Sequence, residues 1–136
     1  MKPPEFICMR EINCCIPIGT VVNTFGVIVR RDEATTSKSI QEGSEIKDLR
    51  ALNIYINDTS NYCTRVCIWD IQVENFIHPV GTVLMFFDLE VLTFNKEITL
   101  NLTRRSRFMS IEKSYEIEKA ELIRNWYLSQ NINRTI

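Results

Sequence analysis

Cysteine is the residue type in this sequence that could most readily support metal binding. The five cysteines are Cys8, Cys14, Cys15, Cys63 and Cys67. Cys63 and Cys67 are four residues apart in a strand-like run, which is not the Cys-x-x-Cys spacing of structural zinc sites. An odd number of cysteines beside a substantial apolar composition favours reduced, intracellular thiols. We therefore expect small apolar side chains here, with no metal site and no cofactor.

Other catalytic arrangements are equally weak in this sequence. His78 is the only histidine and precedes Pro79, a context typical of loops and helix ends. The four glycines form no phosphate-binding loop. The carboxylates show no paired spacing, and a serine or cysteine nucleophile would lack a base. We expect no enzymatic activity.

Composition limits the class of protein. The chain has 136 residues, 45% hydrophobic and 24% charged, which fits one folded domain over 1–136 and excludes disorder. The formal net charge of −1 excludes a globally basic nucleic-acid binder but leaves room for a local basic groove. No apolar run approaches a membrane helix, and the first residues lack the apolar stretch of a secretory signal. We expect no membrane association.

Two hairpin strands are the clearest local prediction. Residues 52–57 and 62–69 each alternate apolar and polar positions, with a turn at 58–61 between them. In the second strand, Val66 and Ile68 are expected to face the core. Arg65 and Trp69 then lie together on the opposite face, because side chains alternate along a strand.

The remaining elements complete an all-β pattern. Residues 21–29 predict a strand in which Gly26 marks a bulge or bend, and the polar segment 31–50 predicts a long mobile loop. Further predicted elements are a short helix at 70–76, strands at 82–91 and 97–102, and a C-terminal helix at 116–128. Five strands with a helix after the third and one at the end fit a five-stranded Greek-key barrel, the oligonucleotide/oligosaccharide-binding (OB) fold.

Several stretches also carry a family resemblance. They are Val22 to Gly26 with Ala34-Thr35, Asn53-Ile54-Tyr55 with Asp58-Thr59-Ser60, Ile68-Trp69, Val83-Leu84 with Phe94, and Ile117 to Tyr127. Their order and spacing, over about residues 6 to 128, resemble the second tandem single-strand-binding OB domain in the large subunit of replication protein A. The ciliate telomerase-associated paralogue of that subunit shares this architecture. The resemblance implies one module of a larger multi-OB protein.

The resemblance also implies how a strand of DNA is held. It implies that Trp69 and Phe94 stack on bases, and that the long first loop and the fourth connection clamp the strand. The sequence departs from the family in one place, because the family's basic pair before the second strand aligns with Ala51 and Leu52.

Further candidate contacts come from the residues themselves. Aromatic rings bind any base, and cations along a groove neutralise phosphates. Arg65 shares a strand face with Trp69, and Tyr55 is expected to point outward from its own strand. The remaining candidates are the cations Lys38, Lys47 and Arg50 of the first loop, and Lys96 beside Phe94.

Two functions remain open at this point. The first is single-stranded DNA binding in the nucleus, in replication, repair or telomere maintenance, with neighbouring OB domains and other replication protein A-like or telomerase subunits as partners. The second is an OB-fold protein-interaction module in such a complex, with little or no DNA binding. Asp32, Glu33, Glu42, Glu45 and Asp48 in the first loop favour the second function, and the Trp69/Phe94 pair favours the first.

Overall fold

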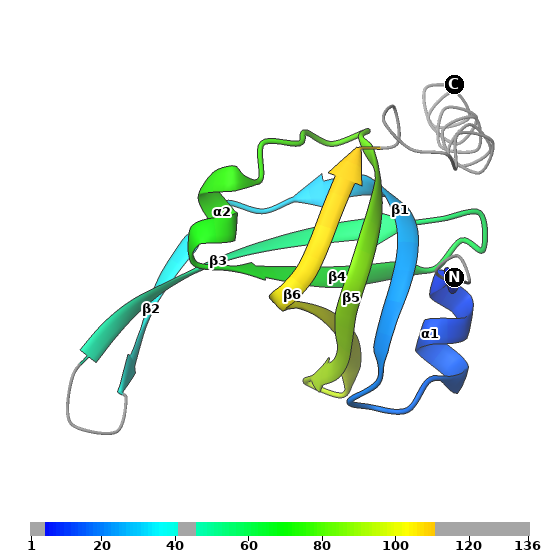
Figure 1. Ribbon diagram of the computed structural model, residues 1–136, viewed down its shortest axis with the longest axis horizontal. Coiled ribbons are helices and arrows are strands. Elements are labelled where there is room, and N and C mark those ends of the chain that lie inside the picture. The colour runs from blue at the N-terminus through cyan, green and yellow to red at the C-terminus, as the bar shows by residue number, and fades with distance from the viewer. Residues whose placement is uncertain (1–4, 41–45, 111–136) are drawn as a thin grey trace.

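A computed structural model describes residues 5–40 and 46–110 of the chain. The elements in chain order are α1 (Met9–Cys15), β1 (Val21–Arg31), β2 (Thr35–Ile40), β3 (Ile46–Asn57), β4 (Cys63–Trp69), α2 (Ile71–Asn75), β5 (Val83–Phe94) and β6 (Glu97–Ser110) (Figure 1). The C-terminal helix expected at 116–128 lies outside the described residues. No helix in the described part of the chain is long and apolar enough to cross a membrane.

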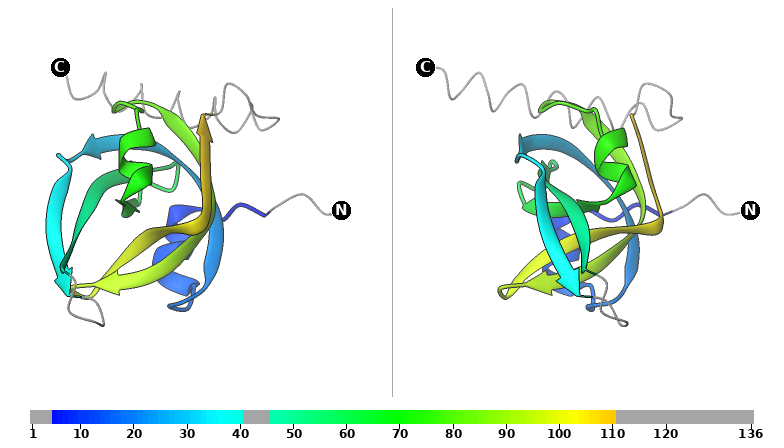
Figure 2. Two further views of the ribbon diagram at one scale, coloured as in Figure 1. Left: turned by 60° about the vertical axis from the view of Figure 1, so that its left-hand side comes forward. Right: turned by 90° about the vertical axis from the view of Figure 1, so that its left-hand side faces the viewer.

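Five of the strands close into a barrel. They pair in the order β1-β5-β6-β4-β3, and β3 pairs with β1 to complete the circle (Figure 2). The β4–β6 contact is parallel, and the other pairings are antiparallel. Helix α2 follows β4, the third strand of the barrel, as the sequence predicts. The OB fold expected from the sequence is therefore confirmed.

Strand β1 can serve two neighbours because it bends. Its first part pairs with β5 and its last part with β3, and the register shifts at Val22/Thr24 and at Ile28/Arg30. The bulges thus flank Gly26 and do not fall on it. A Cβ atom at Gly26 would lie only 2.9 Å from the Cβ of Ile56 on β3, so glycine is needed for the close approach of the two strands.

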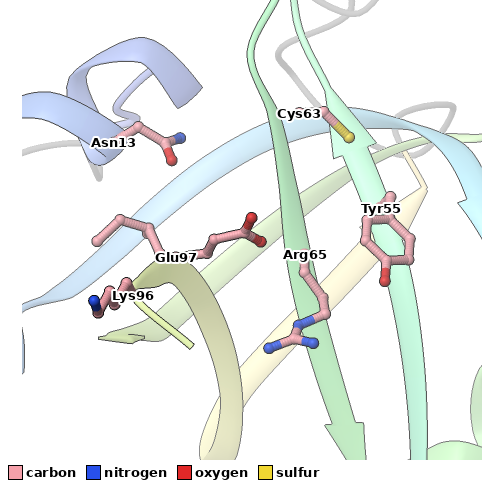
Figure 3. Close-up of a pocket in the computed structure, with 7 residues that line it drawn as sticks. Asn13, Tyr55, Cys63, Arg65, Lys96 and Glu97 are labelled. Carbon is pink, nitrogen blue, oxygen red and sulfur yellow. The ribbon is translucent and has the colours of Figure 1, made fainter. Parts of the chain in front are cut away.

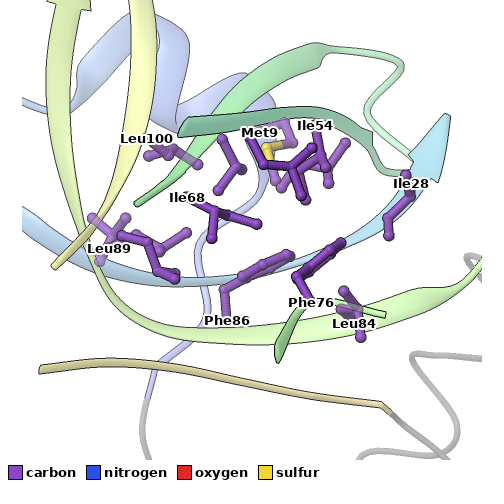
Figure 4. Packing of buried hydrophobic residues seen from close by; sticks show 14 of the residues in the cluster. Met9, Ile28, Ile54, Ile68, Phe76, Leu84, Phe86, Leu89 and Leu100 are labelled. Carbon is purple, nitrogen blue, oxygen red and sulfur yellow. The ribbon is translucent and has the colours of Figure 1, made fainter. Parts of the chain in front are cut away.

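The barrel core follows the period of two that the hairpin sequence predicts. Leu52, Ile54 and Ile56 of β3 are at most 1% exposed, and Val66 and Ile68 of β4 are fully buried. These side chains pack with apolar residues from the other strands and with Met9 of α1 (Figure 4). The odd-numbered residues within 51–57 of β3 and 63–69 of β4 therefore lie on the outer face of the barrel wall, where they can meet a ligand.

The first connection differs from the sequence prediction. Segment 31–50 is largely a β-hairpin arm, in which β2 pairs with β3 from Thr35↔Ala51 to Ile40↔Ile46. Figure 1 shows this arm projecting from the barrel. The prediction of a structureless loop was wrong because backbone pairing in a polar hairpin leaves no alternating apolar pattern to detect. Strands β5 and β6 are also longer than expected, reaching Phe94 and Ser110.

Helix α1 was not predicted from the sequence. It has seven residues, and only Met9 and Ile12 are buried. A pattern of two apolar positions is too short to indicate a helix by its periodicity. The helix packs beside β4, where the side-chain amide of Asn13 donates a hydrogen bond to the hydroxyl of Thr64 at 2.8 Å.

Candidate nucleic-acid interface

The outer face of the barrel carries a groove with a volume of about 360 Å³. Its lining residues come from all strands except β1. They are Thr35, Ala51, Asn53, Arg65, Cys67, Trp69, Leu92, Thr93, Phe94, Thr99 and Asn101. Ten of these eleven positions belong to β3, β4, β5 and β6, and Thr35 adds the base of the β2–β3 arm. We call this surface the base groove.

Trp69 forms one end of the base groove. It is the last residue of β4 and is 37% exposed. Its indole Nε1–H donates a hydrogen bond of 2.6 Å to Oδ1 of Asn101 on β6. This bond holds the ring by its edge and leaves apolar ring surface in contact with solvent, which is the geometry that a stacking platform requires.

Phe94 also lines the base groove and is 57% exposed. It ends β5 directly before a two-residue turn, in which Asn95 and Lys96 have φ of 51° and 67°. Positive φ at both turn positions is the mark of a type I′ hairpin, whose twist matches the flanking strands. The tight turn fixes the ring at the rim of the barrel, so the two predicted aromatic residues share one open surface.

Arg65 connects this ring to the barrel wall. Its guanidinium carbon lies 4.7 Å from the centre of the Phe94 ring, within the range of a cation–π contact. One guanidinium nitrogen, Nη2, also donates a hydrogen bond of 3.0 Å to the hydroxyl of Thr99. The side chain is half-buried, and these two contacts hold its position before any ligand arrives.

A second pocket continues the groove past Arg65. It has a volume of about 370 Å³ and is lined by Asn13, Tyr55, Cys63, Arg65, Lys96, Glu97 and Ile98 (Figure 3). Arg65 lines both pockets, so the two adjoin at this residue. Tyr55 is half-buried beneath Arg30, whose guanidinium carbon lies 4.9 Å from the ring centre. Lys96 is exposed at the β5–β6 turn.

The cations predicted on the first connection are arranged differently. Arg50 is not brought to the base groove, because its guanidinium forms an ion pair of 2.8 Å with Glu74 of α2. Lys38 and Lys47 belong to the β2–β3 arm, in register with Asp48 and Ser39. Their side chains lie outside the described part of the structure. Of the eight predicted contact residues, the structure therefore brings together Trp69, Phe94, Arg65, Tyr55 and Lys96.

Two residues of the base groove were missed by the sequence analysis. Thr99 and Asn101 hold Arg65 and Trp69 in place through their side chains. The signal was available, since Leu100 and Leu102 are buried core residues and their alternate neighbours must face outward. The parallel pairing of β4 with β6 puts these outward positions beside Arg65 and Cys67.

Cys67 lies on the floor of the base groove, between Arg65 and Trp69 along β4. Burial raises the pKa of its thiol, and the neighbouring Arg65 charge opposes this rise. A raised pKa keeps the thiol protonated at neutral pH, which makes it a weak nucleophile. In the described ranges 5–40 and 46–110, no group of three or more cysteine, histidine or acidic residues could hold a metal ion.

Known proteins resemble this chain along most of its length. No family model matches the sequence. The replication factor A 51 kDa subunit of Crithidia fasciculata is 27% identical over 127 residues, covering 93% of this chain and 24% of the relative. A replication protein A heterotrimer bound to single-stranded DNA superposes with a TM-score of 0.76 and 18% identity, over 94% of this chain and 29% of that chain. Pot1 (protection of telomere), in a complex with single-stranded DNA, superposes with a TM-score of 0.70 and 14% identity. This match covers 96% of this chain and 89% of that chain.

These comparisons agree with the geometry of the barrel. The chain is an OB-fold domain that resembles replication protein A, as the sequence motifs indicate. It spans about a quarter of the length of the curated relative. The structural likenesses are below 25% identity and therefore speak for the fold.

Proposed function

We propose that this domain binds single-stranded DNA by stacking bases on Trp69 and Phe94. The observation that carries the proposal is the position of these two partly exposed rings on one groove, with the Arg65 guanidinium between the barrel wall and Phe94. This is the strand face and loop pair that OB folds use for oligonucleotides. Arg65 and Lys96 supply positive charge along the path, although the chain as a whole is nearly neutral.

The similar proteins support a place in DNA replication, repair or telomere maintenance. The relatives and neighbours named above are a replication factor subunit, a single-stranded DNA complex of replication protein A, and a telomere-protection protein. We infer a nuclear role as one module of a longer multi-OB protein. Neighbouring OB domains and further replication protein A-like or telomerase subunits would then be its partners, and linked domains would raise the overall affinity.

A titration followed by tryptophan fluorescence tests the proposal. We would use a Trp126→Phe variant, so that Trp69 is the only tryptophan, and an oligo-dT of about ten nucleotides. Quenching is expected at low salt. The logarithm of the binding constant should fall linearly with the logarithm of the salt concentration, by about 0.7 per phosphate neutralised. Unchanged fluorescence and no binding by a folded protein would instead support the interaction module.

Cys67 provides an independent footprint of the bound strand. Because burial raises the pKa of the Cys67 thiol, we expect slow alkylation by iodoacetamide at neutral pH. The alkylation rate should rise steeply only at a higher pH than it does for a small-molecule thiol. Bound oligo-dT should slow alkylation of Cys67 further. The exposed Cys8, which lies outside the groove, serves as the control. Mass spectrometry of the two peptides measures both rates, and equal protection of the two thiols would contradict a strand lying over β4.

A further inference from the structure

We propose that Arg65 recognises guanine in the bound strand. This inference rests on the proposed function and adds a base preference to it. A groove that only stacked bases and paired phosphates would bind all four bases about equally. The arrangement of hydrogen-bond donors at Arg65 instead favours one base over the others.

The guanidinium of Arg65 lies on the floor of the groove. Arg65 is in the middle of β4, with Tyr55 of β3 and Thr99 of β6 as its register partners on either side. It is therefore part of the floor of the groove and not of its rim. Cys67 separates it from Trp69 along the strand, and two residues of strand span about 6.6–6.8 Å. A base that stacks on Trp69 above Cys67 turns an edge toward Arg65.

Two contacts hold the guanidinium of Arg65 in place. The Phe94 ring supports its carbon at 4.7 Å, and the bond from Nη2 to Thr99 uses one of its five N–H donors. The remaining donors include those on Nε and Nη1, for which the structure gives Arg65 no ion-pair partner within the described residues. A guanidinium that is fixed before binding loses little entropy when it forms two parallel hydrogen bonds.

Guanine is the base whose edge fits these donors. Guanine presents two adjacent acceptors, O6 and N7, on one edge, and a bidentate arginine is their usual partner. Oδ1 of Asn101 is occupied by the Trp69 indole, so the amide offers its N–H groups to a ligand. No aspartate or glutamate lines the base groove in the described part of the chain. Carboxylates accept from the exocyclic amine of cytosine, so the described part of the groove offers no acidic partner for that base.

The experiment measures base preference by competition at fixed low salt. The probes are oligo-dT strands of about ten nucleotides, each carrying one dG at a different position. At the preferred position, the probe with dG should bind at least about fivefold more tightly than the probe with dT, because one bidentate pair provides this discrimination. Hypoxanthine keeps O6 and N7 and should match guanine. The 7-deazaguanine base lacks N7 and should fall to the level of thymine.

Arg65→Lys is the matched variant, because it keeps the charge but loses the planar fork. It should abolish the preference for dG, measured as the ratio of the variant's own affinities for the dG and dT probes. Lys96→Ala serves as the control and should weaken all probes equally. Binding without a preference for dG, or a preference that survives in Arg65→Lys or with 7-deazaguanine, overturns the assignment and leaves the proposed function intact. Failure of every probe to bind overturns both.

Discussion

Replacing Trp69 or Phe94 with alanine is expected to weaken binding of oligo-dT by about 5- to 150-fold each. The stacking of one base on one aromatic ring contributes about 1–3 kcal/mol, and each factor of ten corresponds to about 1.4 kcal/mol. Both rings line the base groove, and the proposal has them stack on different bases. The double variant should therefore lose close to the product of the two single factors. The fluorescence anisotropy of a labelled strand measures the binding constant, also for variants that lack Trp69.

The controls separate binding from folding. Trp69 and Phe94 are 37% and 57% exposed, so their removal should change the free energy of unfolding in urea only slightly. Tyr62→Ala is the matched control, because Tyr62 is an aromatic residue of 43% exposure outside the base groove, and its binding should equal that of the wild type. If the double variant is folded and binds oligo-dT as well as the Tyr62→Ala variant does, the stacking proposal is wrong.

The outward position of Trp69 could be predicted because it depends on one strand. The buried residues Val66 and Ile68 fix the inner face of β4, and every second residue must then point outward. The same local rule places Arg65 and Cys67 beside it. Phe94 could be predicted to be exposed because it lies between the polar residues Thr93 and Asn95 at a connection, although the structure makes it the last residue of β5. These features follow from sequence neighbours and need no knowledge of distant contacts.

The partners of these residues depend on contacts between distant parts of the chain. Asn101 reaches Trp69 only because β4 and β6 pair in parallel, with Cys67 in register with Asn101. No local pattern gives that register. Arg50 shows the opposite case, since its place in the sequence suggested a phosphate contact and a long-range ion pair with Glu74 directs it elsewhere. The sequence of the first connection therefore shows that cations lie in this segment, but it does not show which of them faces the base groove.

Helix α1 was hidden from the sequence for a related reason. Its seven residues carry too little periodicity, and much of its attachment comes from residues about fifty positions away. The backbone N–H of Met9, at the start of the helix, donates a hydrogen bond of 2.8 Å to Oδ2 of Asp58. Asp58 belongs to the turn between β3 and β4, whose residue types predicted a turn but not a helix docked against it.

Replacing Asp58 with alanine is expected to lower the free energy of unfolding by about 2–4 kcal/mol. Asp58 is only 5% exposed, and its second oxygen, Oδ1, accepts from the N–H of Ser60 at 2.9 Å and from the Ser60 hydroxyl. Hydrogen bonds to a charged acceptor contribute about 1.5–3 kcal/mol, and alanine leaves the Met9 N–H without a partner at a buried position. Urea unfolding measures the loss.

Two further variants identify the source of that loss. Asp58→Asn keeps one oxygen acceptor and should fall between wild type and Asp58→Ala, whereas Ser60→Ala removes only the hydroxyl and should cost least. Hydrogen exchange at Met9 should accelerate in both Asp58 variants, since its amide loses its acceptor or gains a poorer one. Equal stability of Asp58→Ala and wild type would show that other contacts hold α1, namely the burial of Met9 and Ile12 and the Asn13–Thr64 hydrogen bond. Because α1 contributes Asn13 to the pocket beside Arg65, this turn also supports one end of the proposed DNA path.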